Sequence, residues 1–312
     1  MTEALLSSDN SGPPVANPRP LPPGRLADYP WLTFLLPILV FMLVGSFEPR
    51  PPKPLKLDAN AAEPDDSDAD ENAAEGEPVD EGMIDAATRS IGIEYRHYPL
   101  IYTIKIVLTS LVMLWVLPGY RTFPWKVHWL SVAVGVIGGI AWIVLCKLHL
   151  EQQVISLVKE LLDMEKDKEV ELGQRSGFDP LKELADNPAW AYGFLAIRLF
   201  GLVLVVPVME EFFLRGFVMR YVVDPEWWKL PFGRVNTAAI VAGTAVPMLM
   251  HLGGELIAAA VWFSAVTWLM LRTKSIWDCV VAHAITNLML GLYVIWSAQS
   301  APPGQQGDWW LM

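Results

Sequence analysis

Residues 189–223 read AWAYGFLAIRLFGLVLVVPVMEEFFLRGFVMRYVV, a stretch of 35 residues that is apolar with few breaks. A transmembrane helix needs roughly 20 consecutive apolar residues, so this stretch is longer than one ordinary span. Pro207 lies near its middle, and a proline inside a helix removes a hydrogen bond and clashes with the preceding turn. The sequence therefore predicts two helical pieces here, one before Pro207 and one after it.

Apolar segments recur on both sides of this stretch. They are residues 31–47, 99–117, 127–147, 235–250, 256–271 and 276–296. The first is long for a signal-peptide core and has no clear small-residue cleavage site, so we predict an uncleaved span. Together with the two pieces around Pro207, the segments predict an all-α fold, a polytopic membrane helical bundle of about eight transmembrane helices.

The composition supports membrane spans and excludes several classes of function. Hydrophobic residues make up 53% of the chain and charged residues only 18%, whereas soluble domains have about 25% charged residues. The net charge of −11 comes largely from acidic residues between positions 58 and 94, and no basic tract suggests nucleic acid. The two cysteines, Cys146 and Cys279, both fall in apolar segments, and no CxxC or HExxH pattern occurs. We therefore expect no disulfide framework, no metal and no cofactor.

The polar parts of the chain flank the spans. Residues 1–30, rich in Pro, Ser and Gly, are predicted to be disordered, followed by the first transmembrane helix at residues 31–47. Residues 48–97 form an acidic linker with almost no large apolar residue at its centre. Such a segment cannot bury enough surface to offset its ordering entropy, so it is also predicted to be disordered.

The remaining boundaries follow from the same change between apolar and polar composition. Residues 98–147 hold two transmembrane helices, residues 189–297 form the membrane core, and residues 298–312 form a C-terminal tail. Between them, residues 148–188 are polar and amphipathic, with apolar residues at spacings of three and four that make one helical stripe. We place this helix on the membrane surface or in the aqueous phase. The stripe consists of Val154, Leu157, Val158, Leu161 and Leu162.

Basic residues give the expected orientation. Arg19, Arg25, Arg121 and Lys126 flank alternate spans, and the positive-inside rule places both flanks in the cytoplasm. The sequence thus predicts a multi-pass integral membrane protein whose acidic linker faces the opposite side.

Ionisable residues inside membrane spans need a reason, because a charge at mid-membrane costs roughly 2.5–3.5 kcal/mol on insertion scales. The clearest cluster is Glu210, Glu211 and Arg215. Glu211 and Arg215 are four residues apart, so they face each other on a helix and can form an ion pair. Glu210 is turned about 100° away from Glu211. A carboxylate in a low-dielectric, water-lined pocket has the properties of a general base.

Two later spans carry further polar groups. His251 lies at the end of the 235–250 segment, one turn after Pro247. In the last span, His283 and Asn287 are four residues apart and share a helix face. A histidine can transfer a proton, and an asparagine amide can donate to a developing oxyanion. Each of these residues alone could instead be an interhelical hydrogen-bond partner, and the Glu–Arg pair a structural clasp.

Four other ionisable residues lie in or beside spans, and we expect structural roles for them. Lys105 and Asp278 lie near span ends, where side chains can reach the interface. Arg198 lies deeper and can pair with an acid, and Glu255 is the fourth member of this group.

Taken in order, these motifs resemble the CAAX-protease and bacteriocin-processing (CPBP) family of intramembrane glutamic endopeptidases. The family pattern is E-E-x-x-x-R, then F-x-x-x-H, then H-x-x-x-N. In this chain Glu210 and Glu211 precede Arg215 at the required spacing, Pro247 stands four residues before His251, and His283 four before Asn287. Pro247 departs from the usual Phe, which affects the packing beside His251. The resemblance covers about residues 190–297, and within it the segments around the motifs, residues 205–220 and 272–294, are similar to the exosortase-associated subgroup in bacteria.

The resemblance implies a mechanism and a location. Glu210 would activate a water molecule, and His251 would position that water or shuttle its proton. His283 and Asn287 would stabilise the oxyanion, while Arg215 would hold Glu211. The chemistry needs no metal, although such a set of side chains can ligate one. The implied substrate is a peptide or membrane-anchored protein, cleaved near the surface of the bilayer, in this case the bacterial inner membrane.

Two other functions remain open from the residues alone. A non-catalytic scaffold, or an immunity or maturation partner, could keep the same residues for structure. A transporter could use the charged cluster as an ion or proton path. Transporters of this kind usually have repeated halves with matching broken helices, and the sequence contains no such repeat.

Overall fold

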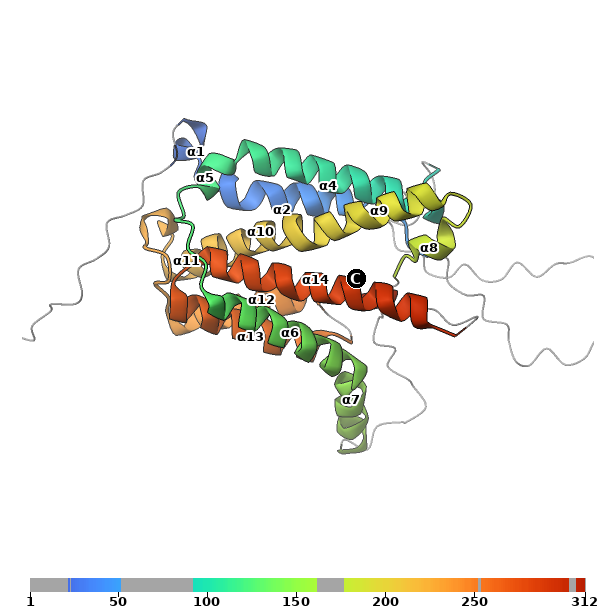
Figure 1. Ribbon diagram of the computed structural model, residues 1–312. Coiled ribbons are helices and arrows are strands. Elements are labelled where there is room, and N and C mark those ends of the chain that lie inside the picture. Colours follow the sequence, from blue (N-terminus) through green and yellow to red (C-terminus); the bar gives the residue numbers. More distant parts are fainter. Residues whose placement is uncertain are drawn as a thin grey trace, which may run out of the picture.

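The computed structural model describes residues 22, 24–51, 92–161, 177–251, 254–302 and 307–311, and these are helical with no strand among them. The expected all-helical bundle is therefore confirmed (Figure 1). Its main single helices are α2 (Leu32–Gly45), α4 (Tyr98–Trp115), α6 (Trp129–Lys147), α12 (Thr237–Leu249), α13 (Leu256–Thr273) and α14 (Ile276–Ser300).

The stretch around Pro207 is one continuous helical rod from Pro188 to Val223, so the prediction of two pieces is wrong. The rod changes its pitch instead of breaking. Its segments are α9 (Pro188–Phe200), the π-helical η2 (Gly201–Val205), α10 (Val206–Glu211), the π-helical η3 (Phe212–Val218) and α11 (Met219–Val223).

The π-helical turn explains why Pro207 is tolerated. In η2 the N–H of Val206 donates to the carbonyl of Gly201, which lies five residues earlier. In a regular α-helix the acceptor lies four residues earlier. The wider turn moves the carbonyl that would clash with a proline ring in a regular helix. Such π-helical turns are rare and often mark functional sites, and here two of them flank Glu210 and Glu211.

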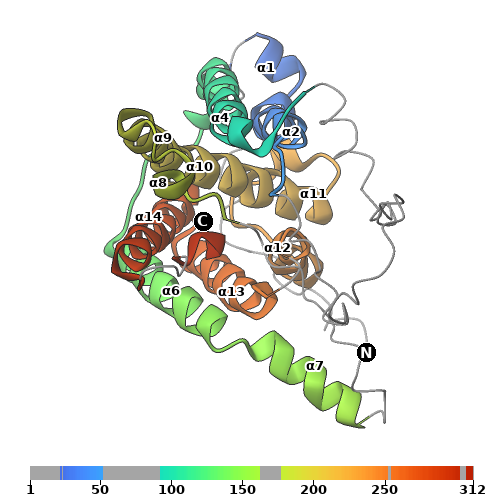
Figure 2. The ribbon, with the colours of Figure 1, turned by 90° about the vertical axis from the view of Figure 1, so that its right-hand side faces the viewer.

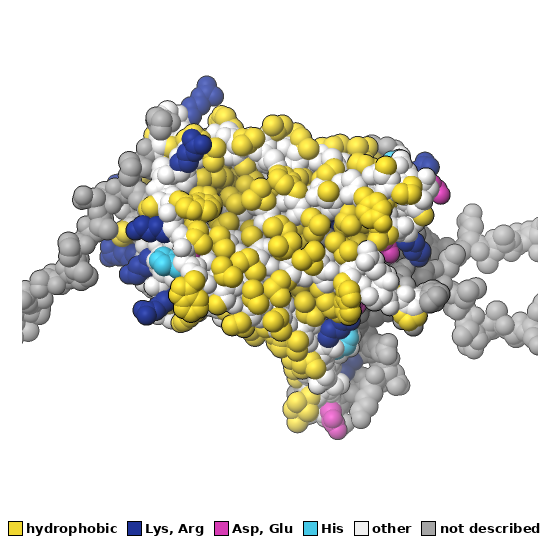
Figure 3. All heavy atoms as spheres, viewed as in Figure 1, with side chains coloured by type: hydrophobic (Ala, Val, Ile, Leu, Met, Phe, Trp, Pro, Cys, Tyr) yellow, Lys and Arg dark blue, Asp and Glu magenta, His cyan; other side chains and the backbone are white. Residues whose placement is uncertain are grey.

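Seven apolar helices build the bundle within the described residues. Five are long and apolar enough to cross a membrane, and two shorter ones, α2 and α12, are also apolar. The expected number was about eight, and the difference arises because the rod is a single helix. The outer face carries an almost continuous belt of apolar side chains between charged ends (Figure 3), as expected for a surface in contact with lipid.

Small residues bring α6 close to α13 and α14. A methyl group at Gly135 would lie 2.8 Å from the Ala282 carbonyl oxygen, and one at Gly138 would lie 2.8 Å from the Trp262 ring. Close approach at small residues is a common way for membrane helices to associate. This packing fixes the first half of α14 around Ala282 and Ile285, next to His283.

The polar regions contain short helices. α1 (Arg25–Asp28) lies in the N-terminal region and the turn η1 (Tyr95–His97) at the end of the acidic linker. α7 (Leu150–Leu161) and α8 (Pro180–Glu183) lie in the amphipathic region, and η5 (Trp309–Leu311) in the C-terminal tail. The disorder predicted for residues 1–30 and 48–97 concerns mainly residues 1–21 and 52–91, which lie outside the described residues, as does Leu162.

Candidate active site

A buried chain of charged groups joins the rod to α14. Arg215 Nη1 lies 2.9 Å from Glu211 Oε2, as the spacing of four residues predicts. Glu211 Oε1 lies 2.9 Å from Nδ1 of His283, which comes from α14. Glu211 and Arg215 are both fully buried, and Arg215 Nη2 also donates to the Phe263 carbonyl. The carboxylate of Glu211 is thus neutralised by Arg215 and fixes the orientation of the imidazole.

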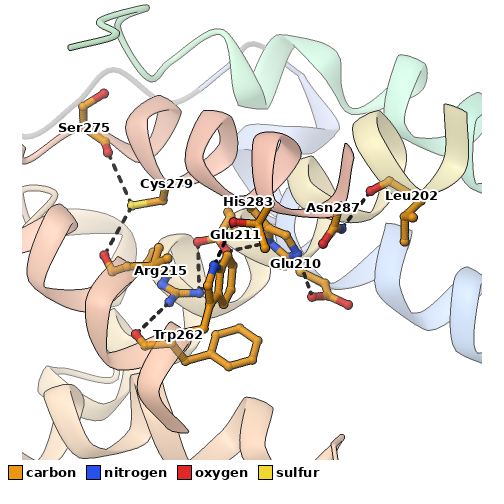
Figure 4. Close-up of polar contacts among 12 residues, drawn as sticks. Leu202, Glu210, Glu211, Arg215, Trp262, Ser275, Cys279, His283 and Asn287 are labelled. Carbon is orange, nitrogen blue, oxygen red and sulfur yellow. Dashed lines mark hydrogen bonds and ion pairs between the residues drawn. The ribbon is translucent and has the colours of Figure 1, made fainter. Parts of the chain in front are cut away.

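Glu210 approaches the same histidine from the other side (Figure 4). Its Oε2 lies 3.9 Å from Nε2 of His283, whereas Glu211 contacts Nδ1. The two neighbouring carboxylates therefore point in different directions, as the helical repeat requires. The Glu210 side chain keeps 17% of its surface exposed and that of Glu211 none. Only Glu210 of the two is accessible to water.

This accessibility comes from a cavity of about 340 Å³ inside the bundle. Its wall brings together four of the six candidate residues, which come from α10, α14 and the turn after α12. The four are Glu210, His251, His283 and Asn287. The other two candidates, Glu211 and Arg215, lie behind the wall and contact its residues His283 and Phe263. The structure thus separates the candidates into a group facing the cavity and a supporting pair.

His251 is oriented by the residue that departs from the family pattern. Its Nδ1 lies 2.9 Å from the carbonyl oxygen of Pro247. A carbonyl only accepts hydrogen bonds, so Nδ1 donates, and in the neutral ring Nε2 is then the basic nitrogen. The rings of Trp142 and Phe263 pack at 5.5 Å and 5.6 Å from the imidazole. The expected change in packing beside His251 is therefore accommodated by aromatic neighbours.

Asn287 supplies the hydrogen-bond donor that is missing in the helix because Pro207 has no backbone N–H. In the π-helical register of η2, the next bond would run from the N–H of residue 207 to the carbonyl of Leu202, and proline has no N–H. Asn287 Nδ2 donates to this carbonyl oxygen at 2.8 Å. The amide group has a second N–H, so one contact with Leu202 still leaves a donor. Asn287 therefore has a structural task in addition to the one predicted.

This arrangement makes a testable expectation about stability. Asn287→Leu should destabilise the protein by about 1–3 kcal/mol, because the partly buried Leu202 carbonyl loses its donor. In a Pro207→Ala background the restored backbone N–H can serve the same carbonyl, so the cost of Asn287→Leu should fall markedly. Unfolding in mixed micelles measures both values as a double-mutant cycle. Equal costs in the two backgrounds would contradict the account.

Sequence reasoning missed several residues of the cavity wall. Trp262 lies edge-on to His283 at 4.6 Å and donates through Nε1 to Thr286 Oγ1 at 3.0 Å. Thr286 in turn donates to the carbonyl of Gly135. The chain has 14 tryptophans, and no spacing distinguishes this one from the others. Only the packing of α13 against α14 identifies it.

The four weaker candidates are all buried. Lys105 pairs with Glu48 at 2.5 Å, and Asp278 pairs with His128 at 2.6 Å. Both side chains are buried inside the protein, whereas the prediction was that they extend to the membrane interface. Arg198 donates to the Phe178 carbonyl at 2.7 Å. These contacts agree with structural roles. Three of the four nevertheless line the cavity, namely Lys105, Arg198 and Glu255, which the sequence did not indicate.

The C-terminal segment closes one part of the cavity. Leu311 lines it, and Trp309 is buried with its ring 5.8 Å from the Arg198 guanidinium. Asp308 anchors the segment, since its Oδ2 lies 2.6 Å from Lys147 Nζ and accepts from the Tyr293 hydroxyl at 2.9 Å.

Acid should release this segment. Partial burial alone raises the pKa of Asp308, but the hydrogen bonds from Lys147 and Tyr293 outweigh it and lower the pKa below its usual value of 3.8. The pKa of Asp308 is therefore lower in the folded protein than in the unfolded chain. In that case the carboxylate contributes its full stabilisation at pH values above the unfolded pKa, and this stabilisation is lost as the pH falls through the folded pKa. We expect amide protection factors of residues 307–311 to fall below about pH 3.8. Asp308→Asn should already lower them at neutral pH. Unchanged protection in the variant would contradict this role of Asp308.

The fold and the cavity together define a helical membrane bundle with a polar cavity at its centre. Residues 192–289, about a third of the chain, match the family model described as type II CAAX prenyl endopeptidase Rce1-like. This part of the membrane core is similar to the type II CAAX prenyl endopeptidases, so the resemblance predicted from the three motifs is confirmed over these residues. No curated protein and no solved structure gives a significant match to the chain. The family match and the apolar helices together indicate an integral membrane protein whose core is similar to the CAAX endopeptidases.

Proposed function

We propose that the protein is an intramembrane, metal-independent glutamic endopeptidase in which Glu210 activates the attacking water. The observation that carries the proposal is the shared cavity wall. Glu210, His251, His283 and Asn287 all line it, whereas the buried Glu211–Arg215 pair supports His283 from behind. A water-accessible carboxylate beside an oriented imidazole is an arrangement suited to general-base hydrolysis.

The reaction begins with a water molecule in the cavity next to Glu210. The carboxylate takes one proton from the water, and the resulting hydroxide adds to the carbonyl carbon of the scissile peptide bond. His251 lines the same cavity and positions the water or relays the proton. The proton then passes to the amide nitrogen as the C–N bond breaks, which gives a new carboxylic acid and a new amine. Transfer of the remaining acidic proton to the amine yields the carboxylate and the ammonium ion. Glu210 returns to its ionised form, so the cycle balances without a cofactor.

The negative charge of the tetrahedral intermediate needs hydrogen-bond donors. Nδ1 of His283 is held by Glu211, so Nε2 is the nitrogen on the side of Glu210 and the cavity. A protonated Nε2 donates to the oxyanion, and the second N–H of Asn287 adds another donor. Glu211 stabilises the positive charge on the imidazole, as an orienting carboxylate does in other hydrolases. Arg215 holds the Glu211 carboxylate in place through their ion pair.

A metal is not needed for these steps. Within the described part of the chain, no group of three or more His, Cys, Asp or Glu side chains is arranged to hold a metal ion. We propose a peptide or membrane-anchored protein as substrate, cleaved near the surface of the bilayer. The resemblance of the segments around the motifs, residues 205–220 and 272–294, to the exosortase-associated subgroup favours a bacterial inner-membrane protein. A non-catalytic scaffold is the alternative, because the Glu211–Arg215–His283 chain also ties two helices together.

Fragment analysis separates these functions. Native membranes containing the wild-type protein, His283→Ala or the surface variant Glu226→Ala are compared by mass spectrometry, with and without a chelator. Cleavage products should appear with the wild type and Glu226→Ala, persist with the chelator, and disappear with His283→Ala at equal expression. Fragments that persist in His283→Ala favour the scaffold, and fragments that the chelator abolishes contradict the metal-independent mechanism.

A further inference from the structure

The helix α7 has three distinct faces. Successive residues are turned by about 100°, so positions three and four apart share a side. Glu151, Ile155 and Lys159 follow one line and are buried or half-buried. Gln152, Ser156 and Glu160 follow a second, exposed polar line. The third face is apolar and exposed. It consists of Val154, Leu157, Val158 and Leu161.

The first face holds α7 against the bundle. Glu151 is 7% exposed, and its Oε1 accepts from the backbone N–H of Ile257 at 2.8 Å. This N–H belongs to the first turn of α13, where backbone donors have no partner within the helix. Glu255, at the start of the same turn, lines the cavity. The position of α7 is thus fixed relative to the cavity wall.

The apolar face has no cover from the described parts of the protein. Leu157 is 55% and Leu161 75% exposed. In Figure 1, α7 leaves the end of α6 and runs across the common direction of the bundle helices, and in Figure 2 it again leads away from the bundle. If α6 crosses the membrane, a helix across its direction lies along the membrane plane.

The apolar face is also continuous with the lipid-facing surface of the bundle. Three apolar side chains in the last turns of α6 and directly after it are about half exposed and form a line towards α7. They are Ile140, Val144 and Leu148. Figure 3 shows the apolar side chains of the bundle continuing onto one side of this projecting helix. A helix with one apolar and one polar face lies in the interface with its apolar side buried roughly 5–10 Å into the boundary of headgroups and acyl chains.

We propose that α7 is an interfacial helix that binds the phospholipid surface, with its apolar face in the acyl-chain boundary and its polar face in water. Lipid and the first turn of α13 therefore hold the same helix from two sides. This surface contact is independent of the peptidase activity, and it decides between the two locations left open by the sequence.

Spin labels on neighbouring residues test the proposal directly. Leu157→Cys and Ser156→Cys place a nitroxide on the apolar and polar faces of the full-length protein in phosphatidylcholine–phosphatidylglycerol nanodiscs. The native Cys146 and Cys279 are at most 1% exposed, so they should remain unlabelled. We expect oxygen, which concentrates among acyl chains, to relax the Leu157 label more than a water-soluble nickel complex does. The order should be reversed for the Ser156 label.

Two results would overturn the proposal. A Leu157 label relaxed mainly by the nickel complex would place α7 in water. A Leu157 label shielded from both reagents, with dipolar broadening between two labels, would mean that a second copy of the chain covers the apolar face. Both variants alter exposed positions, so a folded, monodisperse protein is expected for each.

Discussion

Glu210→Gln is expected to lower kcat by about 10²–10⁴-fold, the usual contribution of a general base. Glutamine has nearly the same shape as glutamate, but it cannot take a proton from water at neutral pH. The Glu210 side chain is partly exposed to the cavity, and the buried ion pair of the site uses Glu211 instead. The melting temperature should therefore stay close to that of the wild type. Initial rates on the cleavage site identified in membranes, together with thermal unfolding, measure both effects.

Glu226 provides the matched control for this variant. It is an exposed glutamate that pairs with Lys229 on the surface. Glu226→Gln makes the same chemical change away from the cavity and should leave kcat and KM unchanged. If Glu210→Gln retained more than about a tenth of the wild-type kcat, Glu210 would not be the general base.

Arg215→Ala is expected to have the largest effect on stability, a loss of about 3–5 kcal/mol in the free energy of unfolding. Both side chains of the Arg215–Glu211 pair are fully buried. Removal of the guanidinium leaves the Glu211 carboxylate with only His283 as an ionisable partner at short distance. An uncompensated charge in a low-dielectric interior is costly, which is the physical reason for the size of the effect. Denaturant unfolding in mixed micelles measures it.

A surface pair and a double variant control for this result. Lys229→Ala removes an exposed pairing with Glu226 and should cost less than about 1 kcal/mol. Replacing Glu211 by leucine and Arg215 by methionine together should recover part of the stability, because neither member of this pair then remains as a buried charge without its partner. A cost of Arg215→Ala as small as that of Lys229→Ala would contradict the assigned role of the pair.

The local geometry of the site could be predicted from the sequence. Glu211 and Arg215 are four residues apart in a helix, so their contact follows from the helical repeat alone. The divergence of Glu210 from Glu211 follows in the same way. The contact between Glu211 and His283 spans 72 positions in the chain, and only the packing of α14 against the rod creates it. Spacing within a motif therefore predicts contacts within helices and not the contacts between them.

The shape of the rod shows where a local rule fails. A proline in a regular helix causes a break or a kink, which made two pieces the reasonable prediction for residues 189–223. The π-helical turn before Pro207 removes the clash, and Asn287 supplies the missing donor. This compensation comes from a residue 80 positions later in the chain. No pattern within the segment itself indicates it.

The apolar residues of the cavity wall could not be predicted from the sequence either. Trp262 belongs to an apolar stretch in which any of several residues could face the interior, and Leu311 belongs to the C-terminal tail, outside the predicted spans. Their positions depend on helix packing and on the anchoring of the C-terminal segment by Asp308. The candidate site thus has a core of charged and polar residues that motifs identify, enclosed by apolar residues that only the fold identifies.

A single turnover in ¹⁸O-labelled water tests the central claim most directly. If Glu210 activates a water molecule that attacks the peptide carbonyl, the new carboxyl terminus of the cleaved substrate should carry one ¹⁸O atom. The enzyme peptide that contains Glu210 should remain unlabelled, and the labelled product should be absent with Glu210→Gln. Label in the Glu210 side chain would indicate a covalent intermediate instead. A labelled product formed equally well by Glu210→Gln would contradict the account.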